Sequence, residues 1–253
     1  MSDSTLPAVQ NPDEAGLSQL QRLIYAFTAP GKLFADFKRS TTWWMPFLVL
    51  VVMSYVLAFA IQTKVGWSQV TENIVQSSPR TAAQFEKLPP EQAATQKKFI
   101  TLSTQFSMYL SPVVILLSMV IIAAVLLFTI NFAFGGKARF GAVLAVLVYA
   151  SLPTIIQSLT GTLALLAGLG ETFNISNFSG TNVAYYLNAA ETAPALYKLA
   201  QAIDPISIWS MALTSIGLAT VAGLKRNSGY IAVFGWWALI LVIKVGWAAA
   251  FGS

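Results

Sequence analysis

Charged residues are absent from five long stretches of the chain. These stretches are rich in Leu, Val, Ile, Ala and Phe, and the segments between them carry most of the Lys, Arg, Asp and Glu residues. A helix needs about 20 apolar residues to cross the roughly 30 Å hydrocarbon core of a bilayer. The pattern therefore predicts an all-α fold, a polytopic membrane bundle of five transmembrane helices at residues 43–61, 107–134, 140–169, 205–224 and 230–251.

The residues before the first span divide into two parts. Residues 1–16 are polar and have little to bury, so we expect them to be disordered and not to form a cleavable signal peptide. Within residues 17–42, apolar side chains recur at helical spacing beside Lys32, Lys38 and Arg39. This pattern predicts an amphipathic segment at the membrane interface, and ordinary packing against the bundle is an equal alternative. Residues 43–251 would then form the transmembrane domain.

Proline and glycine mark the expected breaks between and within the spans. Pro112 should kink the second span, or mark where an interfacial helix that starts near Pro89 gives way to it. Gly135 and Gly136 in "FGGKARFG" predict a tight turn after the second span. Pro153 is expected to break the third span, because proline cannot donate a backbone hydrogen bond within a helix.

Composition supports a membrane protein and removes several kinds of chemistry. Charged residues make up 10% of the chain and apolar residues 56%, whereas soluble domains carry about 25% charged residues. The chain has no Cys and no His, which excludes disulfides, thiol and imidazole catalysis, and zinc sites built on these residues. The net charge of +5 fits attraction to anionic lipid. The expected partner is therefore the lipid bilayer and not nucleic acid.

The distribution of Lys and Arg predicts how the chain crosses the membrane. Four of these residues lie in the N-terminal segment, two at residues 137–139 and two at residues 225–226, and five spans would place these segments on one side. Short cationic segments tend to remain in the cytoplasm. We therefore expect a multi-pass protein with a cytoplasmic N-terminus and its C-terminus outside.

Two charged residues at or within the spans are candidates for a functional site. Asp204 precedes Pro205 at the start of the fourth span, where Asp is a favoured N-cap and Pro a favoured first helical residue. Asp204 could also contact a partner or an ion from outside. Lys244 is the only charged residue inside an expected span. Its amine either extends to the membrane surface or belongs to an internal polar site.

The uncharged polar residues Asn131 and Gln157 also lie inside expected spans. Hydrogen bonds between helices are the usual role of such groups, and the alternative is a substrate pathway. The spacing of Asp and Glu fits no metal or acid–base motif, and no nucleophile is paired with a base. We therefore expect a protein that is not an enzyme and that uses no cofactor.

Four features, taken in order along the chain, resemble the Yip1 domain family of five-span membrane proteins. The first is the basic, aromatic approach to the first span, "APGKLFADFKRSTTWWMPF", and the second is the turn "FGGKARFG". The third is "YASLP" in the third span, and the fourth is "DPISIWSMALTSIGLA" at the start of the fourth. The positions that match the family pattern are Gly135, Gly136, Tyr149, Pro153, Asp204, Trp209 and Gly217.

The resemblance implies a general function. The chain is similar to the bacterial branch of the family, which would place it in a bacterial cytoplasmic membrane. Eukaryotic relatives are Golgi and ER proteins, several of which bind small GTPases, but this chain lacks their Asp-Leu-Tyr-Gly-Pro-like segment before the first span. Small-GTPase binding is therefore not carried over to this chain.

We interpret the chain as a non-enzymatic protein that organises or tethers membrane components. It would act through its N-terminal segment and a face of the bundle, on a membrane-protein partner or a second copy. The alternative is a small oligomeric transporter or channel. Its pathway would bring Asn131, Gln157 and Lys244 into one wet cavity.

Overall fold

The computed structural model describes residues 16–251 apart from 78, 172 and 190, and across these residues the chain is all-helical. The tail expected at residues 1–16 lies outside the described residues except for Gly16. Five helical segments of the described chain are long and apolar enough to span a membrane. They are α3 (Trp44–Lys64), α7 (Ser111–Phe128) with the π-helical turn η1 (Thr129–Ala133), α8 (Phe140–Ala150) with α9 (Thr154–Leu166), α11 (Pro205–Ala222) and α12 (Arg226–Phe251). The expected fold class is confirmed.

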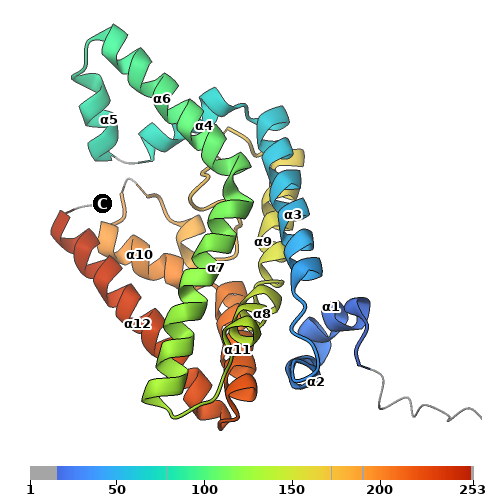
Figure 1. The fold of residues 1–253 in the computed structure, drawn as a ribbon. Coiled ribbons are helices and arrows are strands. Elements are labelled where there is room, and N and C mark those ends of the chain that lie inside the picture. The colour runs from blue at the N-terminus through green and yellow to red at the C-terminus, as the bar shows by residue number, and fades with distance from the viewer. Residues whose placement is uncertain (1–15, 78, 172, 190, 252–253) are drawn as a thin grey trace, which may run out of the picture.

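The spans pack in a bundle with α11 near its centre (Figure 1). Helix α11 contacts α12, α8 and α9, whereas α3 runs along α9 and α7 packs against α8. The α7–α8 turn and the α11–α12 turn meet at one end of the bundle, where the Lys137 backbone N–H donates to the Ala222 carbonyl over 3.2 Å. The C-terminus and the long connections lie at the other end (Figure 1).

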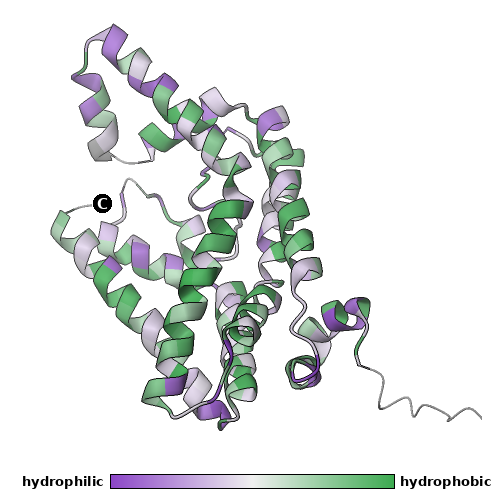
Figure 2. Cartoon of the chain, viewed as in Figure 1, coloured by the Kyte–Doolittle hydropathy of each residue, from purple (hydrophilic) through white to green (hydrophobic). Residues whose placement is uncertain are grey.

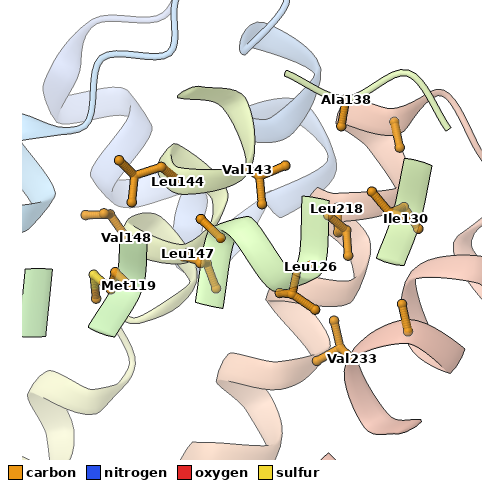
Figure 3. Packing of buried hydrophobic residues seen from close by; sticks show 13 residues of the cluster. Met119, Leu126, Ile130, Ala138, Val143, Leu144, Leu147, Val148, Leu218 and Val233 are labelled. Carbon is orange, nitrogen blue, oxygen red and sulfur yellow. The ribbon is translucent and has the colours of Figure 1, made fainter. Parts of the chain in front are cut away.

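Small and branched apolar side chains fill the centre of the bundle (Figure 3). This cluster joins α7, α8, α11 and α12, and it includes Leu126, Val143, Val148, Leu218 and Val233. The outer faces of α7 and α12 are also mostly apolar (Figure 2). Among their exposed side chains are Ile121, Val242 and Ile243. Apolar residues both inside and outside the bundle are expected of helices surrounded by lipid.

The proline positions explain where helices break. The third span is interrupted at Ser151, Leu152 and Pro153, between α8 and α9, as Pro153 predicts. At the second span, a single residue, Leu110, separates the preceding helix α6 (Pro90–Tyr109) from α7, which begins at Ser111. Pro112 therefore lies in the first turn of α7, where its missing N–H removes no hydrogen bond of the helix. It marks the boundary between α6 and α7 and does not kink the span.

Two connections at the end opposite the short turns contain helices of their own. The first holds α4 (Trp67–Gln76), α5 (Pro79–Glu86) and α6, of which we expected only a helix starting near Pro89. Trp67 and Val70 of α4 are buried in one cluster with Leu57 of α3 and with Leu165 and Phe173, which lie far along the chain. The second connection holds the 3₁₀ turn η2 (Val183–Tyr186) and α10 (Pro194–Ala202), and α10 packs against α12.

The turn before the last span is shorter than expected. Gly223 ends α11 in the left-handed conformation at φ 72°, which glycine adopts without a steric penalty. The Leu224 N–H then donates to the Ala219 carbonyl over 2.9 Å. This tight ending lets α12 begin at Arg226, four residues before the expected Tyr230.

Candidate functional site: the N-terminal hairpin and the Asp204 cluster

Helices α1 (Gln19–Thr28) and α2 (Pro30–Asp36) form the N-terminal hairpin. A reciprocal capping box between Ser18 and Gln21 starts α1. A buried ion pair joins the two helices, with Arg22 Nη2 2.6 Å and Arg22 Nε 2.9 Å from Asp36 Oδ2. The Arg22 side chain is 3% exposed, so this pair is strongly shielded from water. Losing one partner would leave an uncompensated buried charge.

The hairpin packs against the bundle through α2. Leu33, Phe34 and Phe37 are buried in one cluster with Tyr149 of α8 and Leu213 of α11. The Tyr149 hydroxyl lies 3.2 Å from the Thr42 carbonyl and 3.4 Å from Gln19 Oε1, within hydrogen-bonding reach of both. Tyr149 therefore connects the third span to the N-terminal segment on both sides of the hairpin. The segment packs against the bundle, and its place at the membrane interface stays a prediction.

A second face of α1 is apolar and only partly covered by the rest of the chain, through a contact of Phe27 with Trp209 of α11. Leu20, Ile24 and Phe27 are 62%, 49% and 39% exposed, and their spacing of four and three residues places them on one side of the helix. We call these three residues the α1 stripe. The hairpin thus has one face on the bundle and one face left for lipid or another protein.

The hairpin lies beside the bundle and not beyond its end. It occupies the space next to α8 and α11 and below the start of α3 (Figure 1). Tyr149 is nine residues after Phe140, which is about 13 Å along α8 at 1.5 Å per residue. Because Tyr149 contacts Thr42, the first span starts at about that height. The hairpin therefore lies alongside α8 and not beyond its end.

Two family-pattern residues of α11 contact the hairpin. A Cβ on Gly217 would lie 2.6 Å from Val146 Cγ1 and 3.0 Å from Phe34 Cε1. Only glycine therefore lets α2, α8 and α11 meet at this point. Trp209 packs edge-on against Phe27 of α1, with ring centroids 5.7 Å apart. Both residues position the hairpin on the fourth span.

Asn131, Gly135 and Gly136 build the turn between the second and third spans. Gly135 has φ 70°, and the Gly136 N–H donates to the Ile130 carbonyl over 3.0 Å. Asn131 Nδ2 donates to the Ala138 carbonyl over 3.0 Å, and Asn131 Oδ1 accepts from the Ala138 N–H over 2.9 Å. The expectation that Asn131 joins two helices is therefore wrong. Its amide matches the donor and acceptor of Ala138 and holds the turn closed.

Asp204 has all its acceptor positions occupied inside the chain. Oδ1 accepts from the backbone N–H groups of Ile206 at 2.9 Å and Ser207 at 3.3 Å, the arrangement of an N-cap. Oδ2 accepts from Gln157 Nε2 at 2.7 Å and Thr181 Oγ1 at 3.0 Å. A carboxylate offers about four acceptor sites, and Asp204 is 4% exposed. The expected cap is confirmed, and Gln157 makes the expected bond between spans.

A second layer of polar groups surrounds this carboxylate. Asn177 Nδ2 donates to the Tyr197 hydroxyl over 3.1 Å, and Asn182 Nδ2 donates to Asn177 Oδ1 over 2.6 Å. Asn177 and Asn182 are both buried and adjoin a recess of about 300 Å³ beside Gln157 and Asp204. We call these groups, with Thr181, the Asp204 cluster. The cluster fastens the long connection between α9 and α11 to two spans.

The three intramembrane polar residues do not converge on one cavity. Asn131 closes the turn at one end of the bundle, whereas Gln157 belongs to the Asp204 cluster at the other end. Lys244 is exposed on α12 and lines a separate groove with Lys198. Pro153 lies between α8 and α9, where it breaks the span. A pathway lined jointly by these three polar residues is therefore not present in the described chain.

The partners that complete both sites are not apparent in the sequence. Arg22 lies on the face of α1 opposite Leu20, Ile24 and Phe27, so the apolar repeat gives no signal that Arg22 is buried against Asp36. Asn177 and Asn182 lie in an irregular loop that has no periodicity to reveal their burial, and their partner Tyr197 lies in α10. Within the described residues, no three acidic side chains gather to hold a metal ion.

The comparisons with known proteins identify the family. The family profile described as the Yip1 domain matches residues 24–247, which covers the second half of α1, all of α2, the first four spans and most of the fifth. Neither the curated proteins nor the solved structures contain a significant match. The matched region includes Tyr149, Pro153, Asp204 and Gly217, whose contacts hold the spans, the hairpin and the loop together. The chain belongs to the Yip1 domain family of integral membrane proteins.

Proposed function

We propose that this protein is a non-enzymatic organiser that tethers another membrane protein through the α1 stripe. The observation that carries the proposal is a rigidly held helix that displays Leu20, Ile24 and Phe27 toward the surroundings. The ion pair of Arg22 with Asp36 and the contact of Tyr149 with Gln19 hold α1 in place. A surface that is already ordered loses little conformational entropy on binding.

The position of the α1 stripe favours a partner within the membrane. Alongside the spans, the stripe would meet apolar lipid chains or the apolar face of another helix. Large apolar and aromatic side chains such as Phe27 serve as contact anchors in protein interfaces. The polar residues Asn131, Gln157 and Asp204 form hydrogen bonds within the chain. Their contacts support a structural role and not a catalytic one.

The distribution of charge supports a cytoplasmic location for the hairpin. Among the described residues, the half of the molecule with the hairpin and the two short turns holds one carboxylate, Asp36, which is paired with Arg22. The same half holds eight cations, Arg22, Lys32, Lys38, Arg39, Lys137, Arg139, Lys225 and Arg226. Because cationic segments tend to stay in the cytoplasm, we infer a cytoplasmic N-terminus and an external C-terminus. Since the chain resembles the bacterial branch of the family, we infer that it lies in the bacterial cytoplasmic membrane.

Purification of the tagged protein at native abundance tests the tethering. We compare Leu20→Ala/Ile24→Ala with Ile121→Ala/Val242→Ala, a control that shortens two exposed apolar side chains elsewhere on the bundle. We expect a membrane protein in comparable amount to co-purify with the wild type and the control, and to be lost from the α1 variant. Equal recovery with all three forms, or self-association alone, would contradict the proposal.

Single cysteines test the orientation, because the natural chain has none. Lys38→Cys, Lys137→Cys and Lys225→Cys should react with an impermeant thiol reagent only after the membrane is opened. Glu91→Cys in α6 should react in intact cells. Labelling of Lys38→Cys and Lys137→Cys from opposite sides would overturn the five-span topology.

A further inference from the structure

A groove of about 700 Å³ lies between α10, α11 and α12, at the end of the bundle opposite the short turns. Lys198 and Gln201 of α10 line one side, and Lys244 of α12 lines the other. The wall between them is apolar and aromatic and includes Trp237, Ile240 and Trp247. The groove therefore combines a long apolar surface with two amines.

Neither amine has a carboxylate partner in the part of the chain that the structure describes. Within the described residues, neither Lys198 nor Lys244 forms an ion pair, and no Asp or Glu lines the groove. Asp204, the nearest acid along the chain, accepts from Gln157, Thr181 and two backbone N–H groups. Lys244 lies within a helix that spans the membrane, where an unbalanced charge is costly. The groove thus favours an anionic occupant.

The walls of the groove indicate that the occupant also has an apolar part. Ile243 and Trp247 of α12 and Leu199 of α10 are exposed. The groove is thus continuous with surface that faces lipid. Trp side chains are typical of the region where head groups meet acyl chains. A small soluble anion could contact the lysines but would leave the apolar wall uncovered.

We propose that this groove binds one anionic phospholipid from the leaflet on the side of the C-terminus. Its phosphate lies between Lys198 and Lys244, and an acyl chain lies along Trp237 and Ile240. A lipid with a net negative charge partly offsets the two ammonium groups, whereas the choline of a zwitterionic lipid cancels the charge of its own phosphate. This assignment is independent of the tethering proposed for the α1 stripe, which lies on a different part of the bundle.

Native mass spectrometry of the full-length protein in detergent tests the lipid site. The probes are phosphatidylglycerol and phosphatidylcholine with identical acyl chains, titrated separately. We expect the wild type to bind one phosphatidylglycerol in preference to phosphatidylcholine. Each lysine near an anionic lipid contributes a factor of about five in affinity. The Lys198→Gln/Lys244→Gln variant should therefore bind phosphatidylglycerol about twentyfold more weakly.

The matched control is Lys87→Gln/Lys98→Gln. It removes the same charge from two exposed lysines at the same end of the molecule but outside the groove, and its binding should equal that of the wild type. Lys198→Arg/Lys244→Arg keeps both positive charges and should retain the preference for phosphatidylglycerol. This variant therefore distinguishes a loss of charge from a folding defect caused by substitution at these positions. An equal affinity of the wild type for the two lipids would overturn the proposal. An equal loss of affinity for phosphatidylglycerol in the groove variant and in the control would also overturn the proposal.

Discussion

Gln157 Nε2 donates a hydrogen bond of 2.7 Å to Asp204 Oδ2 and so joins the third span to the start of the fourth. The other oxygen of Asp204 caps α11. One carboxylate therefore sets where a helix begins and which neighbouring span it contacts. The Thr181 hydroxyl adds the intervening loop to the same group over 3.0 Å.

Asp204→Ala should destabilise the protein by about 3 kcal/mol. The lost cap accounts for about 1 kcal/mol, and the buried Gln157 and Thr181 donors left without an acceptor account for the rest. Unfolding in detergent, followed by helical circular dichroism, measures the change. Glu171→Ala, which removes an exposed carboxylate of the same loop, should have almost no effect. A loss of 1 kcal/mol or less for Asp204→Ala would show that only the cap contributes.

Arg22→Met should destabilise the hairpin by about 3 to 5 kcal/mol, because it leaves Asp36 buried and unpaired. Arg22→Met/Asp36→Leu should recover much of this loss, since the combined variant buries apolar groups instead of one charge. Protease protection of α1 and α2 provides the measurement. Lys38→Met, at an exposed cation of the same segment, is the control. If the double variant is cleaved as readily as Arg22→Met, the prediction is wrong. The ion pair itself, and not the absence of an unpaired charge, would then stabilise the hairpin.

Gly229→Ala should destabilise the protein by about 1 to 3 kcal/mol through overpacking. A Cβ at Gly229 would collide with the Ser215 carbonyl of α11, whereas a Cβ at Gly235 of the same helix meets nothing within 4 Å. Gly235→Ala should therefore be neutral or slightly stabilising, because Ala favours helix. Thermal unfolding of both variants gives the comparison. Similar values for the two variants would contradict the close contact of α11 with α12.

The packing of α4 against α6 should depend on pH through Glu72. Lys97 donates to Glu72 over 2.5 Å, and hydrogen bonds from Lys97 and then Gln76 hold the pKa of Glu72 below its usual value of 4.5. A lowered folded-state pKa stabilises the protein above the unfolded-state pKa, and this contribution is lost as pH falls through the folded-state value. The contribution is small because the pair is partly exposed.

Hydrogen exchange of α4 and α6 measures this effect against Glu72→Gln. The wild type should be better protected at neutral pH, and the difference should vanish in acid below the folded-state pKa of Glu72. Glu91→Gln, at an exposed residue in the first turn of α6, should not remove the difference. A difference that persists in strong acid would contradict the role of the Glu72 charge.

Sequence patterns were sufficient for the spans and for their local ends. The bilayer thickness dictates long apolar stretches, so five spans followed from charge-free segments. Local chemistry predicted the cap at Asp204, the turn at Gly135 and the break at Pro153. Each of these depends on neighbours within a few residues, and such neighbours are visible in the sequence.

Contacts between distant residues could not be predicted in this way. The ion pair of Arg22 with Asp36 depends on how α1 folds back on α2. Gln157 was expected to bond another helix, but nothing in the sequence indicates that its partner is Asp204, 47 residues away. Asn73 of the outer helix α4 donates to the Phe173 carbonyl, 100 residues further along the chain. These features depend on three-dimensional packing, which a single sequence does not specify.

The most direct test of the tethering is photo-crosslinking from Ile24 in native membranes. A photoreactive amino acid replaces Ile24 in the α1 stripe or, as a control, Ile121 on the exposed face of α7. The tethering account predicts that position 24 crosslinks to a single protein of another kind in high yield, while position 121 crosslinks mainly to lipid. Crosslinks to lipid alone from both positions would contradict the account and leave α1 as a membrane-interface helix without a protein partner.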